Sequence, residues 1–334
     1  MDKKNIIEFK NLHTYFYTDK GVVRAVNGVS FAIPEGKTVA VVGESGSGKS
    51  VTALSLMGLV AKPQGKIVDG EILMDGQDIT KFSKEKMREI RGRDLSMIFQ
   101  EPMTSLNPSL RIGFQLEEIF HRILGLSKEE SKKKSLELLE MVEIPNPKEK
   151  IRAFPHELSG GQKQRVMIAM ALASKPKVLI ADEPTTALDV TIQAEVLDLM
   201  KRLQQETGTS ILLITHDLGV VAEMADEVVV MYGGRVVEKN DVFGIFDNPE
   251  HPYTQGLLKA RPTLENRDQK LYNIPGNVPN PMDLGEECPF ANRCTYVMDI
   301  CRKQVPEEIV RDEDHRVSCF LYKEGLDGKS SIKS

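Results

Sequence analysis

Residues 43–50 read Gly-Glu-Ser-Gly-Ser-Gly-Lys-Ser, and this stretch decides the fold. It follows the compact apolar run Thr38 to Val42, which is typical of a buried strand, and it opens an apolar helical segment. Glycines let backbone N–H groups wrap around phosphate oxygens without Cβ clashes, and the amides at a helix start attract anions. The stretch therefore predicts a phosphate-binding loop. A flexible Gly/Ser linker is the alternative, and both flanks argue against it.

The loop has the pattern of the Walker A motif of NTPases. We expect Lys49 to reach the β- and γ-phosphates and the hydroxyl of Ser50 to ligate Mg²⁺. The residues expected to contact nucleotide here are Gly43, Glu44, Ser45, Gly46, Ser47, Gly48, Lys49, Ser50 and Val51. The loop alone indicates only an NTPase.

A second apolar run, residues 178–181, ends in the acids Asp182 and Glu183. A carboxylate at this position can hold Mg²⁺ through water, because that ion gives up its hydration shell reluctantly. Glu183 would then lie near the γ-phosphate and orient or deprotonate the attacking water. The alternative is a solvated strand end.

Composition places the chain among ordinary globular proteins. It has 334 residues, 40% hydrophobic and 28% charged, with a formal charge of -5. This charge argues against broad binding to nucleic acid or an anionic bilayer. No apolar run approaches the roughly 18 residues that span a membrane, and the N-terminus does not read as a signal sequence. We therefore expect a cytosolic protein.

The order of apolar runs predicts an α/β fold with a parallel sheet and crossover helices. A helical insert is expected from residue 102 to about 175, between strand segments. Residues 228–231 and 235–238 flank Gly233-Gly234 and predict a hairpin. Prolines become frequent after about residue 240, which predicts a boundary between a domain of residues 1–240 and a segment of residues 241–334.

Leu158-Ser159-Gly160-Gly161-Gln162 precedes a helix and adds a second anion-binding helix start. Alone it could be an ordinary helix N-cap. Combined with the two preceding motifs in this order, it resembles the signature motif of the ABC (ATP-binding cassette) family. The resemblance implies a P-loop NTPase cassette with a RecA-like core sheet, an antiparallel β subdomain and a helical subdomain at about residues 102–175. It also implies a cassette dimer, in which Ser159, Gly160, Gly161 and Gln162 cap ATP held by the other subunit.

Four further features of the sequence match ABC motifs. Gln100 looks like the Q-loop glutamine, which senses Mg²⁺ and the transmembrane partner, and His216 looks like the switch histidine at the γ-phosphate. Ala187-Leu188-Asp189 resembles the D-loop at the dimer interface. Phe16 is our choice for the ring that stacks on adenine, although Tyr15 or Tyr17 could serve and any of the three could be core.

Three segments resemble the ATP-binding subunits of oligopeptide and dipeptide importers: residues 100–116, NPEHPYTQGLLKARP and CPFANRC. The resemblance implies a peripheral subunit at the cytoplasmic face of the membrane. Its implied partners are a second, distinct ATPase subunit, two transmembrane permease subunits and, indirectly, an extracytoplasmic solute-binding protein. Import of nickel or another small solute remains an alternative. A nucleic-acid-associated ABC ATPase would carry two cassettes or a coiled-coil insertion, and a degenerate binding module would lack catalytic residues present here.

All four cysteines, Cys288, Cys294, Cys301 and Cys319, lie near the C-terminal end, and in a cytosolic protein such a cluster favours metal over disulfides. Structural zinc usually takes two closely spaced pairs, which are absent here, whereas iron–sulfur clusters accept more varied spacing. The spacing alone leaves both open. Some peptide-importer ATPases carry a cluster in this extension, so the resemblance implies a structural [4Fe–4S] cluster, with zinc as the alternative.

Overall fold

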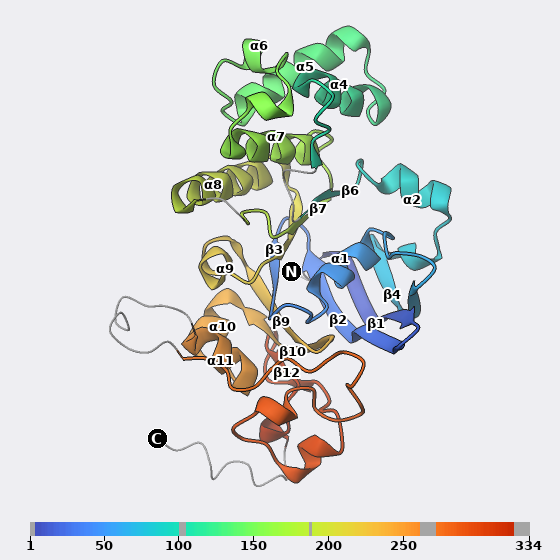
Figure 1. The fold of residues 1–334 in the computed structure, drawn as a ribbon, viewed down its shortest axis with the longest axis vertical. Helices are drawn as coiled ribbons and strands as arrows, with labels where there is room; N and C mark the ends of the chain where they lie inside the picture. Colours follow the sequence, from blue (N-terminus) through green and yellow to red (C-terminus); the bar gives the residue numbers. More distant parts are fainter. Residues whose placement is uncertain (1–3, 100–104, 187–188, 261–271, 324–334) are drawn as a thin grey trace. The chain divides into compact units, whose positions relative to one another are not determined.

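The structure is a computed structural model that describes residues 4–99, 105–186, 189–260 and 272–323. Its internal contacts divide the chain into two compact units, which are considered separately (Figure 1). The first unit consists of Met1–Ile6, Ile33–Thr38 and Lys81–Ile214. The second consists of Ile7–Ala32, Val39–Thr80 and Thr215–Ser334.

The first unit contains parallel strands in the order β8-β7-β6. They are β6 (Leu95–Ile98), β7 (Val178–Asp182) and β8 (Ser210–Ile214). Every residue of β7 and β8 is buried, as their continuous apolar sequences predict.

The helices of this unit include the helical insert that the family resemblance implies, and the bounds of about 102–175 stay a prediction. The helices are α2 (Lys84–Ile90), α4 (Ile112–Arg122), α5 (Lys128–Met141), α6 (Pro147–Lys150), α7 (Gly160–Leu172) and α8 (Val190–Thr207). Figure 1 shows α4 to α7 gathered together in green, and α4 and α5 both contact α7. Helix α7 also packs on α8 and β6, so the helical insert is joined to this unit's strands through α7.

The second unit contains a four-stranded sheet in the order β2-β1-β4-β5. The strands are β1 (Asn5–Thr18), β2 (Gly21–Pro34), β4 (Gly65–Met74) and β5 (Gln77–Asp78). β1 pairs antiparallel with β4, and their partners include Ile7 with Met74 and Phe16 with Gly65. This is the antiparallel subdomain that the family resemblance implies.

A second group of strands in this unit has the order β11-β12-β10-β9-β3. They are β3 (Thr38–Val42), β9 (Glu227–Tyr232), β10 (Arg235–Asp241), β11 (Ile309–Val310) and β12 (Arg316–Val317), with helices α1 (Lys49–Leu56), α9 (Leu218–Met224), α10 (Val242–Asp247) and α11 (Pro252–Lys259). The hairpin between β9 and β10 turns at Gly233 and Gly234, whose φ angles are +54° and +78°. Both angles lie in the left-handed region that glycine tolerates, so the predicted hairpin is confirmed.

Short 3₁₀ turns complete the described elements. They are Ile79–Lys81, Pro155–Glu157, Ala291–Arg293, Asp299–Arg302 and Phe320–Tyr322. Among the described residues no helix is long and apolar enough to cross a bilayer.

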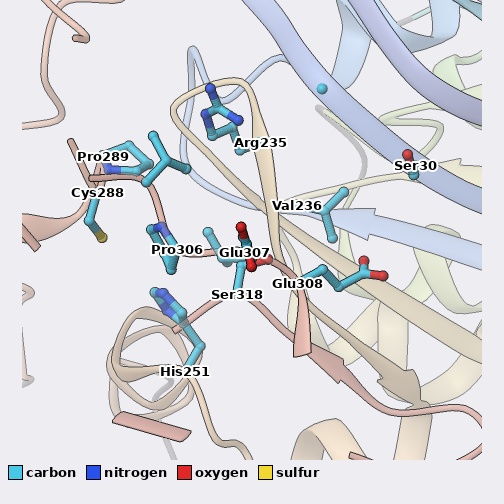
Figure 2. Close-up of a pocket in the computed structure, with 13 residues that line it drawn as sticks. Ser30, Arg235, Val236, His251, Cys288, Pro289, Pro306, Glu307, Glu308 and Ser318 are labelled. Carbon is cyan, nitrogen blue, oxygen red and sulfur yellow. The ribbon is translucent and has the colours of Figure 1, made fainter. Parts of the chain in front are cut away.

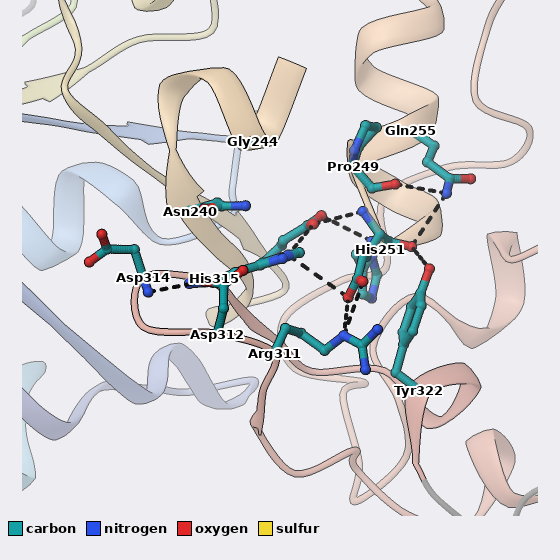
Figure 3. A network of polar contacts seen from close by, with 12 residues as sticks. Asn240, Gly244, Pro249, His251, Gln255, Arg311, Asp312, Asp314, His315 and Tyr322 are labelled. Carbon is teal, nitrogen blue, oxygen red and sulfur yellow. Dashed lines mark hydrogen bonds and ion pairs between the residues drawn. The ribbon is translucent and has the colours of Figure 1, made fainter. Parts of the chain in front are cut away.

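The segment after residue 240 is anchored on β10 by a polar network (Figure 3). The carboxylate of Glu238 is fully buried and accepts hydrogen bonds from the backbone N–H groups of Glu250 at 2.7 Å and His251 at 3.0 Å. Nε2 of His315 lies 3.0 Å from the same carboxylate, and Arg311 donates to Glu250 at 3.0 Å. These contacts satisfy a carboxylate that would be costly to bury alone. The predicted boundary near residue 240 falls inside β10 and stays a prediction.

Candidate functional site

The phosphate loop lies between β3, all of whose residues are buried, and α1. Gly43 and Gly48 have φ angles of +151° and +101°. A Cβ atom on Gly43 would come within 2.2 Å of the carbonyl oxygen of Met231, and one on Gly48 within 2.3 Å of that of Ala25. Only glycine fits these two positions, so close packing against neighbouring backbone maintains the loop conformation that the sequence predicts.

Lys49 is the first residue of α1 and is buried at 8% exposure. Its Nζ donates to the carbonyl oxygens of Gly43 at 2.7 Å and Glu44 at 3.0 Å. The ammonium therefore lies against the loop's own backbone, where it can also meet phosphate oxygens. The left-handed glycines, the start of α1 and this ammonium fit a nucleotide triphosphate with Mg²⁺, for which Ser50 supplies a hydroxyl next to Lys49.

Two residues from beyond position 250 bind Glu44 of the loop. The hydroxyl of Tyr253 accepts a hydrogen bond from the backbone N–H of Glu44 at 2.8 Å. Arg293 donates to both carboxylate oxygens of Glu44, one of them at 3.1 Å. The hydrogen bonds to Glu44 raise the pKa of Arg293. Sequence reasoning missed both residues and found no role for Arg293, because only the fold brings it to the loop.

The remaining bonds of Arg293 secure the guanidinium itself. Its Nε donates to the carbonyl of Pro275 at 2.9 Å, and its other groups reach the carbonyl of Ile274 and the hydroxyl of Tyr232, both at 3.3 Å. The side chain is only 5% exposed. Such a fully used, planar donor set is the geometry for which arginine is preferred over lysine.

In the first unit, β7 carries the predicted acidic pair. Asp182 ends the strand and is 5% exposed. Glu183 has a φ of +48°, a left-handed conformation that is uncommon for a non-glycine residue. Its carboxylate accepts from the hydroxyl of Thr186 at 2.9 Å, and its N–H donates to Ile214 at 2.8 Å. Strain of this kind persists where surrounding bonds impose it and is often found at functional sites.

The segment 158–162 forms the predicted helix start. The hydroxyl of Ser159 accepts from the N–H of Gln162 at 3.3 Å, and the amide oxygen of Gln162 accepts from the N–H of Ser159 at 3.2 Å, which makes a capping box. Ser159 and Gly160 are exposed. A Cβ on Gly161 would lie 2.9 Å from Ile192 of α8, so close helix packing requires this glycine. The start of α7 is therefore capped, closely packed at Gly161 and exposed at Ser159 and Gly160.

Gln164 on α7 was not predicted. It is fully buried, and its amide donates to the carbonyl of Pro184, directly after Glu183. It thereby connects α7, which begins at the predicted signature motif, to the segment that follows the acidic pair. The sequence carries no signal for this contact, because it depends on how α7 packs against the segment after Glu183.

The remaining predicted residues have distinct surroundings. Asp189 caps α8 through a bond from the N–H of Ile192 at 3.0 Å. His216 follows β8 and is exposed. Gln100 and the pair Ala187-Leu188 lie outside the described residues.

The three candidate adenine-stacking rings differ in their environment. Tyr15 donates to Asn27 at 2.9 Å and is held in a polar cluster. Phe16 is half-buried beside Gly65, and Tyr17 is 45% exposed with Lys66 over its ring. Phe16 stays our choice, with Tyr17 as its alternative.

The predicted [4Fe–4S] cluster is wrong. In the part of the chain that the structure describes, no group of three or more His, Cys, Asp or Glu side chains is arranged to hold a metal ion, and this applies equally to zinc. Cys288, Cys294, Cys301 and Cys319 are free thiols that line a narrow, apolar pocket beside Phe320. Burial raises the pKa of Cys288 to about 11 and that of Cys319 to about 12. The thiols act as small hydrophobic groups in a local core.

Comparison with known proteins agrees with this geometry. Residues 26–186 match the family model described as ABC transporter, and residues 237–301 match that of the oligopeptide/dipeptide transporter C-terminal region. The chain belongs to the family of oligopeptide and dipeptide ABC transporter ATP-binding proteins. It is 52% identical to the oligopeptide transport ATP-binding protein AppD of Bacillus subtilis, over 96% of this chain and 97% of that protein. It is 48% identical to the dipeptide transport ATP-binding protein DppD of the same organism, over 95% of each.

Solved structures confirm the cassette fold. The ADP- and Pi-bound cassette MJ0796, whose structure is described as dimeric, has a TM-score of 0.63 at 29% identity and covers 71% of this chain and 98% of its own. CbiO1 from Clostridium perfringens, part of the transporter complex cbiONQ, has a TM-score of 0.62 at 30% identity, over 73% of this chain and 91% of its own. The ABC ATPase family thus makes this chain an ATP-hydrolysing enzyme that uses ATP and Mg²⁺.

Proposed function

We propose that this chain hydrolyses ATP to energise the import of dipeptides or oligopeptides through a membrane permease. The observation that carries the proposal is the similarity of nearly the whole chain to oligopeptide and dipeptide transport proteins, together with its match to the oligopeptide/dipeptide transporter C-terminal region. A cassette match alone would leave the transported solute open.

For hydrolysis, we assign phosphate binding to the loop amides and Lys49. Ser50 and Asp182 would hold Mg²⁺, which supplies positive charge to the phosphate oxygens when bound. Glu183 would accept the proton of the attacking water, and Thr186, which donates to its carboxylate at 2.9 Å, would orient it. His216 would contact the γ-phosphate. Gln100 remains assigned to Mg²⁺ and permease sensing from the sequence resemblance alone.

A second cassette would complete each nucleotide site. The exposed, capped start of α7, with Ser159 and Gly160, presents backbone N–H groups suited to a phosphate held by another subunit. Asp189 would face that partner. We further propose a distinct, related partner chain, two permease subunits and attachment at the cytoplasmic membrane face, with a solute-binding protein acting from the other side.

The test is to purify the tagged chain with its permease from native membranes and to reconstitute the complex in vesicles. ATP hydrolysis is then measured with the co-purifying solute-binding protein alone, with trialanine and with Ni²⁺. We expect trialanine to stimulate hydrolysis and Ni²⁺ to have no effect, with the Glu183→Gln complex as the inactive control. Stimulation by Ni²⁺ but not by peptide would overturn the substrate assignment.

A further inference from the structure

A cavity of about 340 Å³ lies in the unit that carries the phosphate loop (Figure 2). Its walls come from β2, from β10 and from the segment after residue 240. Among the described lining residues none belongs to the phosphate loop. This volume lies within the range of small-molecule sites.

Arg235 provides the positive charge of this cavity. It is half-buried beside Gly28, and among the described residues its guanidinium has no hydrogen-bond or ion-pair partner. Burial, with a smaller contribution from the charge of Arg24, lowers the pKa of Arg235. Arg293 in the same unit shows the usual arrangement, with its donors fully used. A partly desolvated and unpaired guanidinium is costly, and a bound anion would offset that cost.

Negative charge lines another part of the same cavity. Glu307 and Glu308 contribute carboxylates, and Figure 2 shows both apart from Arg235. Glu308 lies 3.7 Å from Arg316, whereas Glu307 has no ion-pair partner among the described residues. Glu307 is therefore the better acceptor for a cationic group of a ligand.

The rest of the cavity lining includes apolar and hydroxyl groups. Val236 and Pro306 are buried and apolar, and the hydroxyls of Ser30 and Ser318 can hydrogen-bond a polar backbone. The hydroxyl of Ser30 already accepts from the N–H of Asn11 at 2.9 Å, so its proton remains to be donated. A cavity that has a positive and a negative group apart from each other, and a lining of apolar and hydroxyl groups, suits a dipolar molecule better than a simple anion.

We propose that this cavity binds a zwitterion, an α-amino acid or a short peptide, with the ligand carboxylate at Arg235 and its ammonium group at Glu307. The site is separate from the phosphate loop and would bind its ligand whichever solute the permease carries. It would therefore give the ATPase subunit a small-molecule binding site in addition to its nucleotide site.

Isothermal titration calorimetry on the full chain tests the site with four probes: alanine, dialanine, N-acetyl-dialanine and dialanine amide. We expect alanine and dialanine to bind, and each modification of a terminus of dialanine to weaken its binding by about tenfold or more, because each removes one charge-assisted contact. Acetate serves as the simple-anion probe and should bind far more weakly.

Two variants test which residue binds each end of the ligand. Arg235→Gln should reduce zwitterion affinity at least about tenfold and leave ATP affinity unchanged, because Arg235 lies outside the phosphate loop. Glu307→Gln should weaken dialanine but not its N-acetyl form. Arg122→Gln, an exposed arginine on α4, is the control.

Three results would overturn the proposal: no binding of any zwitterion at millimolar concentration, equal affinity for dialanine and its amide, or acetate binding as tightly as dialanine. The comparison of unmodified and modified probes needs only wild-type protein, so it decides the matter even if Arg235→Gln fails to fold.

Discussion

Replacing Arg293 by methionine tests whether the segment after residue 240 stabilises the phosphate loop. Methionine keeps an unbranched side chain of similar length but removes the charge and all donors. The variant loses both bonds to Glu44 and the bonds to the carbonyls of Ile274 and Pro275. Glu44 belongs to the phosphate loop, so losing the bonds to its carboxylate should also weaken nucleotide binding.

The expected loss in the free energy of unfolding follows from how deeply the Arg293–Glu44 ion pair is buried. Breaking a buried ion pair by removing one partner costs about 3–5 kcal/mol. The Arg293 side chain is 5% exposed, but that of Glu44 is 28% exposed and can recover part of its hydration. We therefore expect the lower end, about 3 kcal/mol in the free energy of unfolding, which is roughly a hundredfold in the equilibrium constant.

Urea unfolding followed by circular dichroism and titration with a fluorescent ATP analogue measure the two effects. Arg302→Met is the matched control, because Arg302 belongs to the same segment but is exposed and, among the described residues, donates only to Asn292, at 3.2 Å. Glu44→Gln completes a double-mutant cycle with Arg293→Met, and we expect clear coupling between the two changes. Additive effects, or an Arg293→Met protein that unfolds and binds nucleotide like the Arg302→Met control, would refute the proposed contact.

Three further predictions concern turnover and pH. Glu183→Gln should bind ATP but lose steady-state hydrolysis in the assembled complex, because it removes the base and keeps the shape; near-normal turnover would contradict the assignment. The isolated chain should show specific ATPase activity that rises with protein concentration if, as proposed, a second cassette completes each site; constant activity from a demonstrated monomer would argue otherwise. Burial lowers the pKa of His251 in the folded chain to about 3. As the pH falls, His251 is therefore protonated in the unfolded chain before it is protonated in the folded chain, and the free energy of unfolding should fall by about 1.5 kcal/mol from pH 6.5 to 5. Urea unfolding at both pH values should show a smaller fall in His251→Gln than in the wild type or in the exposed-site control His156→Gln.

Much of the cassette could be predicted because its signals are local. The run Thr38 to Val42, the glycines after it and the helix start at Lys49 are adjacent in the chain, and each has one favoured conformation. The same is true of Gly233-Gly234, whose left-handed angles make the predicted hairpin turn. Backbone sterics and apolar periodicity make such elements recognisable in the sequence, although packing against Met231 and Ala25 also maintains the loop.

Contacts between residues far apart in the sequence decided the features that could not be predicted. The four cysteines have a spacing compatible with a metal site, but thiol ligation depends on side-chain directions and on burial, and in the fold they join an apolar core. Arg293 lies 249 residues from Glu44 in the sequence, and no periodicity relates them. The sequence by itself predicted the loop assigned to phosphate binding, because its glycines allow backbone angles that other residues rarely adopt. Only the tertiary structure placed Arg293 and Tyr253 against that loop, because pairing a buried charge depends on which surfaces the folded chain brings together.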